Sequence, residues 1–255
     1  MTTLDHTLYA ALAAAYGLLA VTFAVRRNGV PAFGWLVCAV HAGWLVLRAV
    51  EVGRTPFTSL YECLSLFAWS GALALLLVRR FGKEPLRWSG LILFGFMAAA
   101  MAYGLTKDAT PKPLSPALDS IWFEVHVVPA FAAYALFVAA FALQLEFLVT
   151  ASRRPRLDYL SRTLILFGFP LLSFGIFSGA AWAEEAWGTY WSWDPKETAS
   201  LVTWFVYAIY LHSRVVAGWK GRPTAIISIV GFLSVIFTYL GVNIFLSGLH
   251  SYGAR

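Results

Sequence analysis

The chain alternates long apolar runs with short polar connections. Eight apolar segments each reach about 17–25 residues or more, the length that an α-helix needs to cross the hydrocarbon core of a bilayer. They cover approximately residues 7–25, 31–50, 59–78, 89–106, 121–150, 163–182, 198–217 and 224–247. The pattern therefore predicts an all-α, polytopic membrane protein with about eight transmembrane helices.

Composition favours a single integral membrane domain over residues 1–255. The 255 residues are 60% hydrophobic and only 13% charged, whereas soluble domains usually carry about 25% charge. The N-terminal stretch MTTLDHT lacks the basic region of a cleavable signal peptide. The two cysteines, Cys38 and Cys63, are too few for a disulfide framework and are typical of small buried thiols.

Basic residues are distributed unevenly among the connections. The first, third, fifth and seventh connections together hold thirteen of the nineteen Lys and Arg residues. Because Lys and Arg are retained on the cytoplasmic side, these connections should be cytoplasmic and both termini should lie outside the cytoplasm. The net charge of +6 therefore reflects membrane topology and does not indicate a nucleic-acid partner.

Two histidines fall within the membrane by this topology. His41 lies near the middle of the second apolar run, and His212 lies in the inner half of the seventh. An ionisable side chain at this depth is costly unless it is paired or ligating, so each is a candidate functional residue. Their depths are similar enough for one flat cofactor to bridge them. A hydrogen bond to a neighbouring helix is the alternative for each.

A second pair of histidines lies on the outer side, together with the aromatic stretch WGTYWSWDPKET at residues 187–198. Two neutral imidazoles, from His126 and His250, can hold an iron axially from opposite faces. A macrocycle held in this way needs an apolar platform. The candidate platform residues are Trp182, Trp187, Tyr190, Trp191 and Trp193. An aromatic belt at the interface is the alternative, but a belt distributes its aromatic residues over all the spans.

The motif Trp187-Gly188-Thr189-Tyr190-Trp191-Ser192-Trp193-Asp194 matches the WGxxWxWD signature of the haem-handling WWD family of cytochrome c assembly, which this chain resembles. The following residues PKET, and the stretches at 53–69 and 242–253, are similar to the CcsA/ResC branch of that family, which belongs to system II. The resemblance therefore covers most of the chain.

The resemblance implies that His126 and His250 ligate haem b, bound non-covalently, at an external WWD loop over about residues 182–198, with Gly188 and Asp194 in the motif. It also implies that His212 ligates a second haem inside the membrane. The other ligand of that haem is His41 or a residue of a CcsB/ResB-type partner. Asp194 either caps the following helix or acts on haem propionates. Arg48 and Arg54 either meet propionates or snorkel to the interface.

The function implied by the resemblance is delivery of haem across the membrane and its presentation to the CxxCH segment of apocytochrome c. The chain would act within a holocytochrome c synthase complex in a bacterial cytoplasmic membrane, with the haem-presenting loop on the periplasmic side. Thiol-reducing proteins and membrane lipid are further expected partners. The alternatives are a b-type electron carrier with two haems and a solute transporter without haem.

Overall fold

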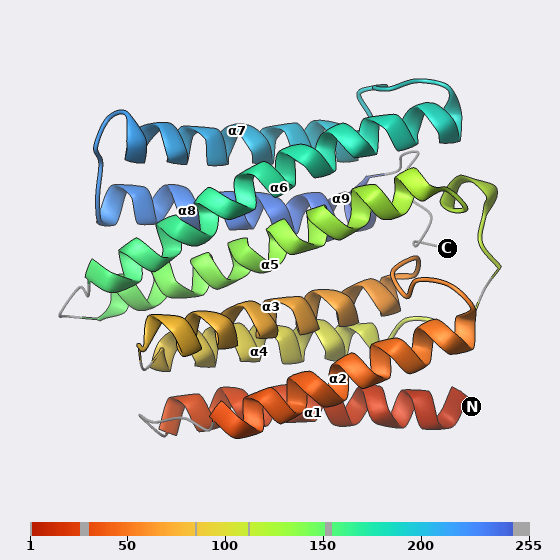
Figure 1. The fold of residues 1–255 in the computed structure, drawn as a ribbon, viewed down its shortest axis with the longest axis horizontal. Helices are drawn as coiled ribbons and strands as arrows, with labels where there is room; N and C mark the ends of the chain where they lie inside the picture. Colours follow the sequence, from red (N-terminus) through yellow and green to blue (C-terminus); the bar gives the residue numbers. More distant parts are fainter. Residues whose placement is uncertain (1, 26–30, 85, 112, 151–154, 247–255) are drawn as a thin grey trace. The chain divides into compact units, whose positions relative to one another are not determined.

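The computed structural model describes residues 2–25, 31–84, 86–111, 113–150 and 155–246, and within these ranges all regular structure is helical (Figure 1). The chain divides into two compact units, Met1–Pro113 and Leu114–Arg255. The single domain expected over residues 1–255 therefore stays a prediction.

The first unit, called unit 1, has four long helices among its described residues. They are α1 (Thr2–Val25), α2 (Pro31–Val52), α3 (Leu60–Gly82) and α4 (Arg87–Gly104). Helix α3 begins at a capping box, in which the Ser59 hydroxyl accepts from the Glu62 N–H and the Glu62 carboxylate accepts from the Ser59 N–H. In the core, the ring of Tyr9 stacks on that of Tyr61 with centroids 4.2 Å apart.

The second unit, called unit 2, also has four long helices in the part of the chain that the structure describes. Its elements are a 3₁₀ turn (Pro116–Leu118), α5 (Ile121–Val149), α6 (Pro155–Trp187), α7 (Pro195–Val215), α8 (Arg222–Ile236), a π-helical turn (Phe237–Gly241) and α9 (Val242–Phe245). Phe137 of α5 stacks on Tyr207 of α7, with ring centroids 3.8 Å apart and planes 14° apart. Gly168 and Gly231 face these rings, and a Cβ at either position would come within 3 Å of ring atoms. Glycine therefore allows this close helix packing.

The polytopic membrane class predicted from sequence is confirmed. Six helices among the described residues are long and apolar enough to cross a bilayer. They cover Leu4–Val25, Ala32–Val52, Leu60–Gly82, Ile121–Val149, Pro155–Trp187 and Arg222–Gly241. The other two long helices lie where the sequence predicted spans, but α4 has only 18 residues and α7 starts with the polar run PKETAS.

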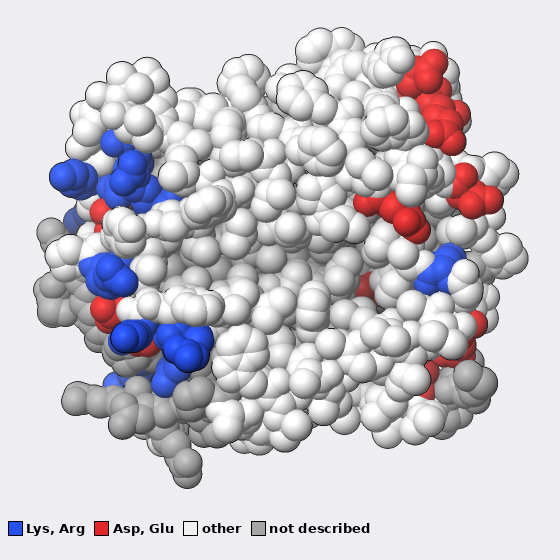
Figure 2. Space-filling model, viewed as in Figure 1, with Lys and Arg blue, Asp and Glu red and all other residues white. Residues whose placement is uncertain are grey.

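Charged side chains gather toward the ends of the helices, with uncharged surface between them (Figure 2). In unit 2, Arg156, Arg214 and Arg222 lie at the end where α6 and α8 begin and α7 finishes. Glu184 and Glu197 lie at the opposite end, where α6 finishes and α7 begins. The assignment of the basic end to the cytoplasm stays a prediction.

Candidate functional site

His126 lies in the second turn of α5, at the end of unit 2 that carries the tryptophan-rich loop. Ser120 caps this helix, because its hydroxyl accepts from the Trp122 N–H at 3.1 Å. The His126 side chain is half-buried, and its Nδ1 lies 2.6 Å from the Gly175 carbonyl oxygen on α6. A carbonyl can only accept, so Nδ1 carries the proton of the neutral imidazole. Nε2 therefore keeps its lone pair, as a metal ligand requires.

The contact between α5 and α6 depends on small residues of α6. A Cβ added at Gly175 would lie 3.3 Å from the Ala130 Cβ, so the two backbones pack closely here. Ser178 lies on the same face, and its hydroxyl donates to the carbonyl of Phe174 at 2.7 Å. Sequence analysis did not single out these residues. The signal that could have indicated close packing of α5 and α6 was the spacing of Gly175, Ser178 and Gly179, which places these small residues on one helix face opposite His126.

Trp182 is buried beside His126. Its indole is nearly parallel to the imidazole, with planes 11° apart and centroids 6.0 Å apart. The indole Nε1–H donates to the Ala117 carbonyl in the 3₁₀ turn at 2.6 Å. Trp187, the last residue of α6, packs edge-on against Trp182, with ring centroids 5.1 Å apart. These contacts place the predicted platform residue Trp182 next to the predicted ligand His126, and Trp187 next to Trp182.

The loop between α6 and α7 carries the remaining aromatic residues of the motif. Gly188 ends α6 in the left-handed conformation, at φ +77°, and its N–H donates to the Glu184 carbonyl. Tyr190 and Trp193 are 63% and 69% exposed, and Trp191 is half-buried. Trp193 has a positive φ of 59°, which is unusual for a residue with a side chain and turns the chain into α7. The loop thus presents flat aromatic side chains at the surface.

Asp194 and Glu197 hold this loop to the start of α7. The Asp194 side chain accepts from the Lys196 N–H at 2.9 Å. The Glu197 carboxylate accepts from the N–H groups of Ser192 and Asp194, at 2.8 and 3.2 Å, which completes a capping box. Of the two roles considered for Asp194, the structure therefore shows the helix cap.

The other predicted ligands have different surroundings. His212 is exposed on α7. His41 is fully buried in unit 1, where its Nδ1 lies 2.7 Å from the Tyr16 hydroxyl and its Nε2 lies 2.7 Å from the Ser65 hydroxyl. Iron ligation by His41 would require one of these hydrogen bonds to be given up, so that role stays a prediction. His250 lies outside the described residues.

Arg48 and Arg54 belong to an ionic cluster in unit 1. The Arg48 guanidinium donates to Glu62 at 3.2 Å, to Asp5 at 3.4 Å and to the Ala109 carbonyl at 2.6 Å. Arg54 donates to the other oxygen of Glu62 at 3.0 Å. Arg48 is only 2% exposed, so it does not snorkel to the interface as the alternative proposed. The propionate role considered for Arg48 and Arg54 stays a prediction.

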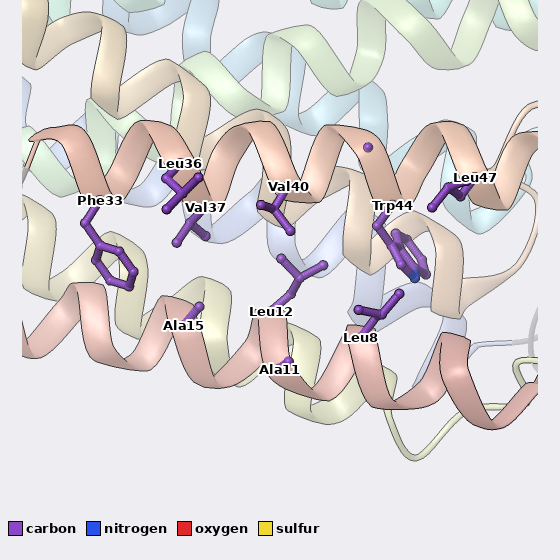
Figure 3. Close-up of a pocket in the computed structure, with 11 residues that line it drawn as sticks. Leu8, Ala11, Leu12, Ala15, Phe33, Leu36, Val37, Val40, Trp44 and Leu47 are labelled. Atoms are coloured by element: carbon purple, nitrogen blue, oxygen red, sulfur yellow. The ribbon is translucent and has the colours of Figure 1, made fainter.

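Unit 1 also has an apolar groove of about 450 Å³ between α1 and α2 (Figure 3). Its lining residues are Leu8, Ala11, Leu12, Ala15, Phe33, Leu36, Val37, Val40, Gly43, Trp44 and Leu47. None of these described lining residues is a histidine, so they supply no imidazole ligand. The described residues also contain no group of three or more His, Cys, Asp or Glu side chains that could hold a free metal ion. An iron inside a porphyrin needs only axial protein ligands.

Comparisons with known proteins agree with the sequence resemblance. The "Cytochrome C assembly protein" family model matches residues 57–250. "Cytochrome c biogenesis protein CcsA" of Chlamydomonas reinhardtii is 42% identical over 225 residues, which cover 82% of this chain and 64% of that protein. The CcsA of Synechococcus sp. (strain CC9605) is 37% identical, with coverages of 82% and 81%.

A solved structure supports the fold. "Cytochrome c Heme Lyase CcmF" superposes with a TM-score of 0.72 at 19% identity, over 93% of this chain and 46% of that chain. At this identity the likeness shows the fold alone. The family match and the CcsA relatives show the family, and the chain belongs to the Cytochrome C assembly protein family.

Proposed function

We propose that this chain handles haem as a substrate, moves it across the membrane and presents it at the WWD loop for covalent attachment to apocytochrome c. The observation that carries the proposal is the state of His126. Its Nδ1–H donates a hydrogen bond to the Gly175 carbonyl. The lone pair of Nε2 is therefore available to ligate a metal, next to the tryptophan-rich loop. In a cytochrome c assembly protein, a metal-ligating nitrogen beside an aromatic loop is what binding of haem iron requires.

The loop residues supply the rest of this external site. Tyr190, Trp191 and Trp193 offer apolar, flat side chains at the surface, where a macrocycle can bind and still be released. Glu197 keeps the loop attached to α7 through the N–H groups that it accepts from. His250 is the proposed second axial ligand. Haem held at the surface would leave its two vinyl groups within reach of the two cysteine thiols of a CxxCH segment.

The attachment itself requires no net oxidation. Each cysteine S–H adds across one vinyl C=C bond, so that the sulfur bonds to one carbon and hydrogen is added to the other. The histidine of CxxCH can then replace one axial imidazole, which releases the product. The part that we assign to this chain is binding, orientation and release. Catalysis of thioether formation is assigned to the complex as a holocytochrome c synthase.

His212 is proposed to hold haem at an earlier stage, within the membrane. Its side chain is exposed on α7, so a neighbouring protein can reach it. A CcsB/ResB-type membrane protein is the proposed source of the second ligand, because both nitrogens of His41 already have hydrogen-bond partners. In this arrangement the basic helix ends face the cytoplasm, and the WWD loop faces the periplasm with the apocytochrome and its thiol-reducing proteins.

Absorption spectra of the purified protein test the external site. We expect a low-spin, bis-imidazole haem spectrum that weakens in His126→Ala and in His250→Ala. His6→Ala is the matched control, because His6 lies in unit 1 and packs on Tyr61. Retention of the full spectrum in the double variant would rule out the assigned ligands.

A transfer assay tests the destination of the haem. Co-expression with an apocytochrome carrying CxxCH should give haem that stays bound to the cytochrome in acid and acetone, and SxxSH should not. Loss of the product in His126→Ala would link the site to transfer. Rapid reduction of the bound haem by quinol, with no transfer to apocytochrome, would instead indicate the b-type electron carrier.

A further inference from the structure

We propose that three residues of α6, Gly175, Gly179 and Trp182, position His126 so that its Nε2 is the atom that meets iron. Trp182 is then a positioning residue that supports the imidazole, and the surface that contacts the macrocycle is left to the exposed residues of the loop. This inference rests on the proposed function, because it assigns roles around the same histidine.

The first contact sets the tautomer. The Gly175 carbonyl oxygen lies 2.6 Å from Nδ1 of His126 and can only accept a hydrogen bond. The proton of the neutral ring is therefore fixed on Nδ1. A hydrogen bond from the far side of a ligating imidazole also orients the ring and raises the basicity of its other nitrogen. The hydrogen bond to the Gly175 carbonyl thus makes Nε2 a stronger ligand for iron than it would be without this bond.

The second contact leaves room for the ring. A Cβ built at Gly179 would lie 2.7 Å from Nδ1 and 2.9 Å from Cε1 of His126. The obstructed atoms belong to a rigid ring that already has a hydrogen bond, so the ring itself would have to move. Any residue larger than glycine at position 179 would therefore turn the imidazole away from the Gly175 carbonyl.

The third contact fixes the plane of the ring. The Trp182 indole lies nearly parallel to the imidazole, at 11°, and its Nε1–H is tied to the Ala117 carbonyl at 2.6 Å. An axial imidazole stands roughly perpendicular to the porphyrin that it ligates, because its nitrogen lone pair lies in the ring plane. An indole parallel to that imidazole is therefore also roughly perpendicular to the porphyrin. Trp182 cannot stack face to face on the macrocycle while it keeps this orientation.

A further link holds the outer ends of α5 and α6 together. The Ser120 hydroxyl, which caps α5, also donates to the Glu185 carboxylate of α6 at 2.9 Å. The imidazole thus sits between two helices whose outer ends are joined by this contact, and the bond of Trp182 to Ala117 ties α6 to the 3₁₀ turn that precedes α5. Such a support keeps the donor atom in place while haem binds and leaves.

The first experiment uses the haem-free protein. In ¹⁵N-histidine NMR of the chain in lipid nanodiscs, the signals lost in His126→Gln identify His126. We expect a protonated Nδ1 and a bare Nε2 in the wild type. A proton on Nε2 would overturn the proposal whether or not the protein binds haem.

The second experiment compares three variants by haem affinity and by the reduction potential of the bound haem. Gly179→Ala should lose the Nδ1 tautomer preference and weaken haem binding by about 10–100-fold, the usual effect of disturbing a residue that orients a ligand. Trp182→Phe keeps an aromatic ring but lacks the Nε1–H donor. It should shift the potential and weaken binding less than Gly179→Ala does.

Gly168→Ala is the matched control on the same helix. A Cβ at residue 168 would lie 2.6 Å from the Phe137 ring of α5, so it also disturbs the contact between α5 and α6, but it does not touch His126. It should lower thermal stability, but the His126 tautomer and the reduction potential of the bound haem should be the same as in the wild type. The proposal is overturned if Gly168→Ala changes the His126 tautomer and the reduction potential as much as Gly179→Ala does. It is also overturned if Gly179→Ala binds haem with the affinity of the wild type. A wild type that takes up no haem would instead refute the proposed function.

Discussion

Glu197 is the residue that attaches the WWD loop to α7, and its replacement by alanine gives a sharp test of that role. One carboxylate oxygen accepts from the Ser192 N–H at 2.8 Å and from the Asp194 N–H at 3.2 Å. The Ser192 hydroxyl lies 3.3 Å from both carboxylate oxygens. The side chain is only 8% exposed, so water does not readily replace it. Glu197→Ala should therefore detach the loop without removing any of its aromatic residues.

The size of the effect follows from the two backbone hydrogen bonds. A typical intramolecular hydrogen bond contributes about 0.5–1.5 kcal/mol net, so two contribute about 1–3 kcal/mol. Each 1.36 kcal/mol changes an equilibrium about tenfold. The open form of the loop should therefore become roughly 5–150 times more populated in Glu197→Ala. Glu197→Gln keeps an acceptor oxygen at the same place and should lose much less.

Hydrogen exchange of the loop amides measures this opening. Exchange at Ser192 and Asp194 should speed up by the same factor in Glu197→Ala, since local opening exposes these N–H groups. Exchange in the core of unit 2, for example at Tyr207, should not change. Wild-type exchange at Ser192 in Glu197→Ala would show that the carboxylate does not hold the loop. Equally fast exchange in Glu197→Gln would assign the effect to lost charge and not to lost acceptors.

Other substitutions test the remaining side chains. Asp194→Asn should retain the helix cap and the haem spectrum. Asp194→Ala should lower the free energy of unfolding by about 0.5–2 kcal/mol. A complete loss of haem in Asp194→Asn would indicate that Asp194 acts on the haem propionates. Arg48→Met should destabilise the protein by about 3–5 kcal/mol in detergent unfolding, because it removes the ion pairs that Arg48 makes with the buried Asp5 and Glu62 and leaves Glu62 with Arg54. Unchanged stability would contradict a buried ion pair. His41→Leu should cost about 1–3 kcal/mol through unpaired hydroxyls and keep the haem spectrum, and loss of the membrane haem would assign iron to His41.

The sequence by itself determined the helical membrane class and the position of the loop. Long apolar runs fix helices because, without water, backbone groups must bond within their own segment. A cap at Asp194 was one of the two roles that the sequence left open, and the structure shows it as a capping box with Glu197. The motif from Trp187 to Asp194 was enough to indicate the family, because its tryptophans and aspartate stand at fixed spacing. These signals are local, so the order of residues carries them completely.

Only the tertiary structure decided how the ring nitrogens of the histidines are hydrogen-bonded. His41 and His126 both occur in apolar helices, and nothing in their immediate sequence separates them. Tyr16 and Ser65 occupy both nitrogens of His41, while the Gly175 carbonyl occupies one nitrogen of His126, 49 residues away in the chain. These partners come from other helices, and the rotation and distance of packed helices are not encoded by apolar periodicity. Hydrogen bonds across helices therefore had to be seen in three dimensions.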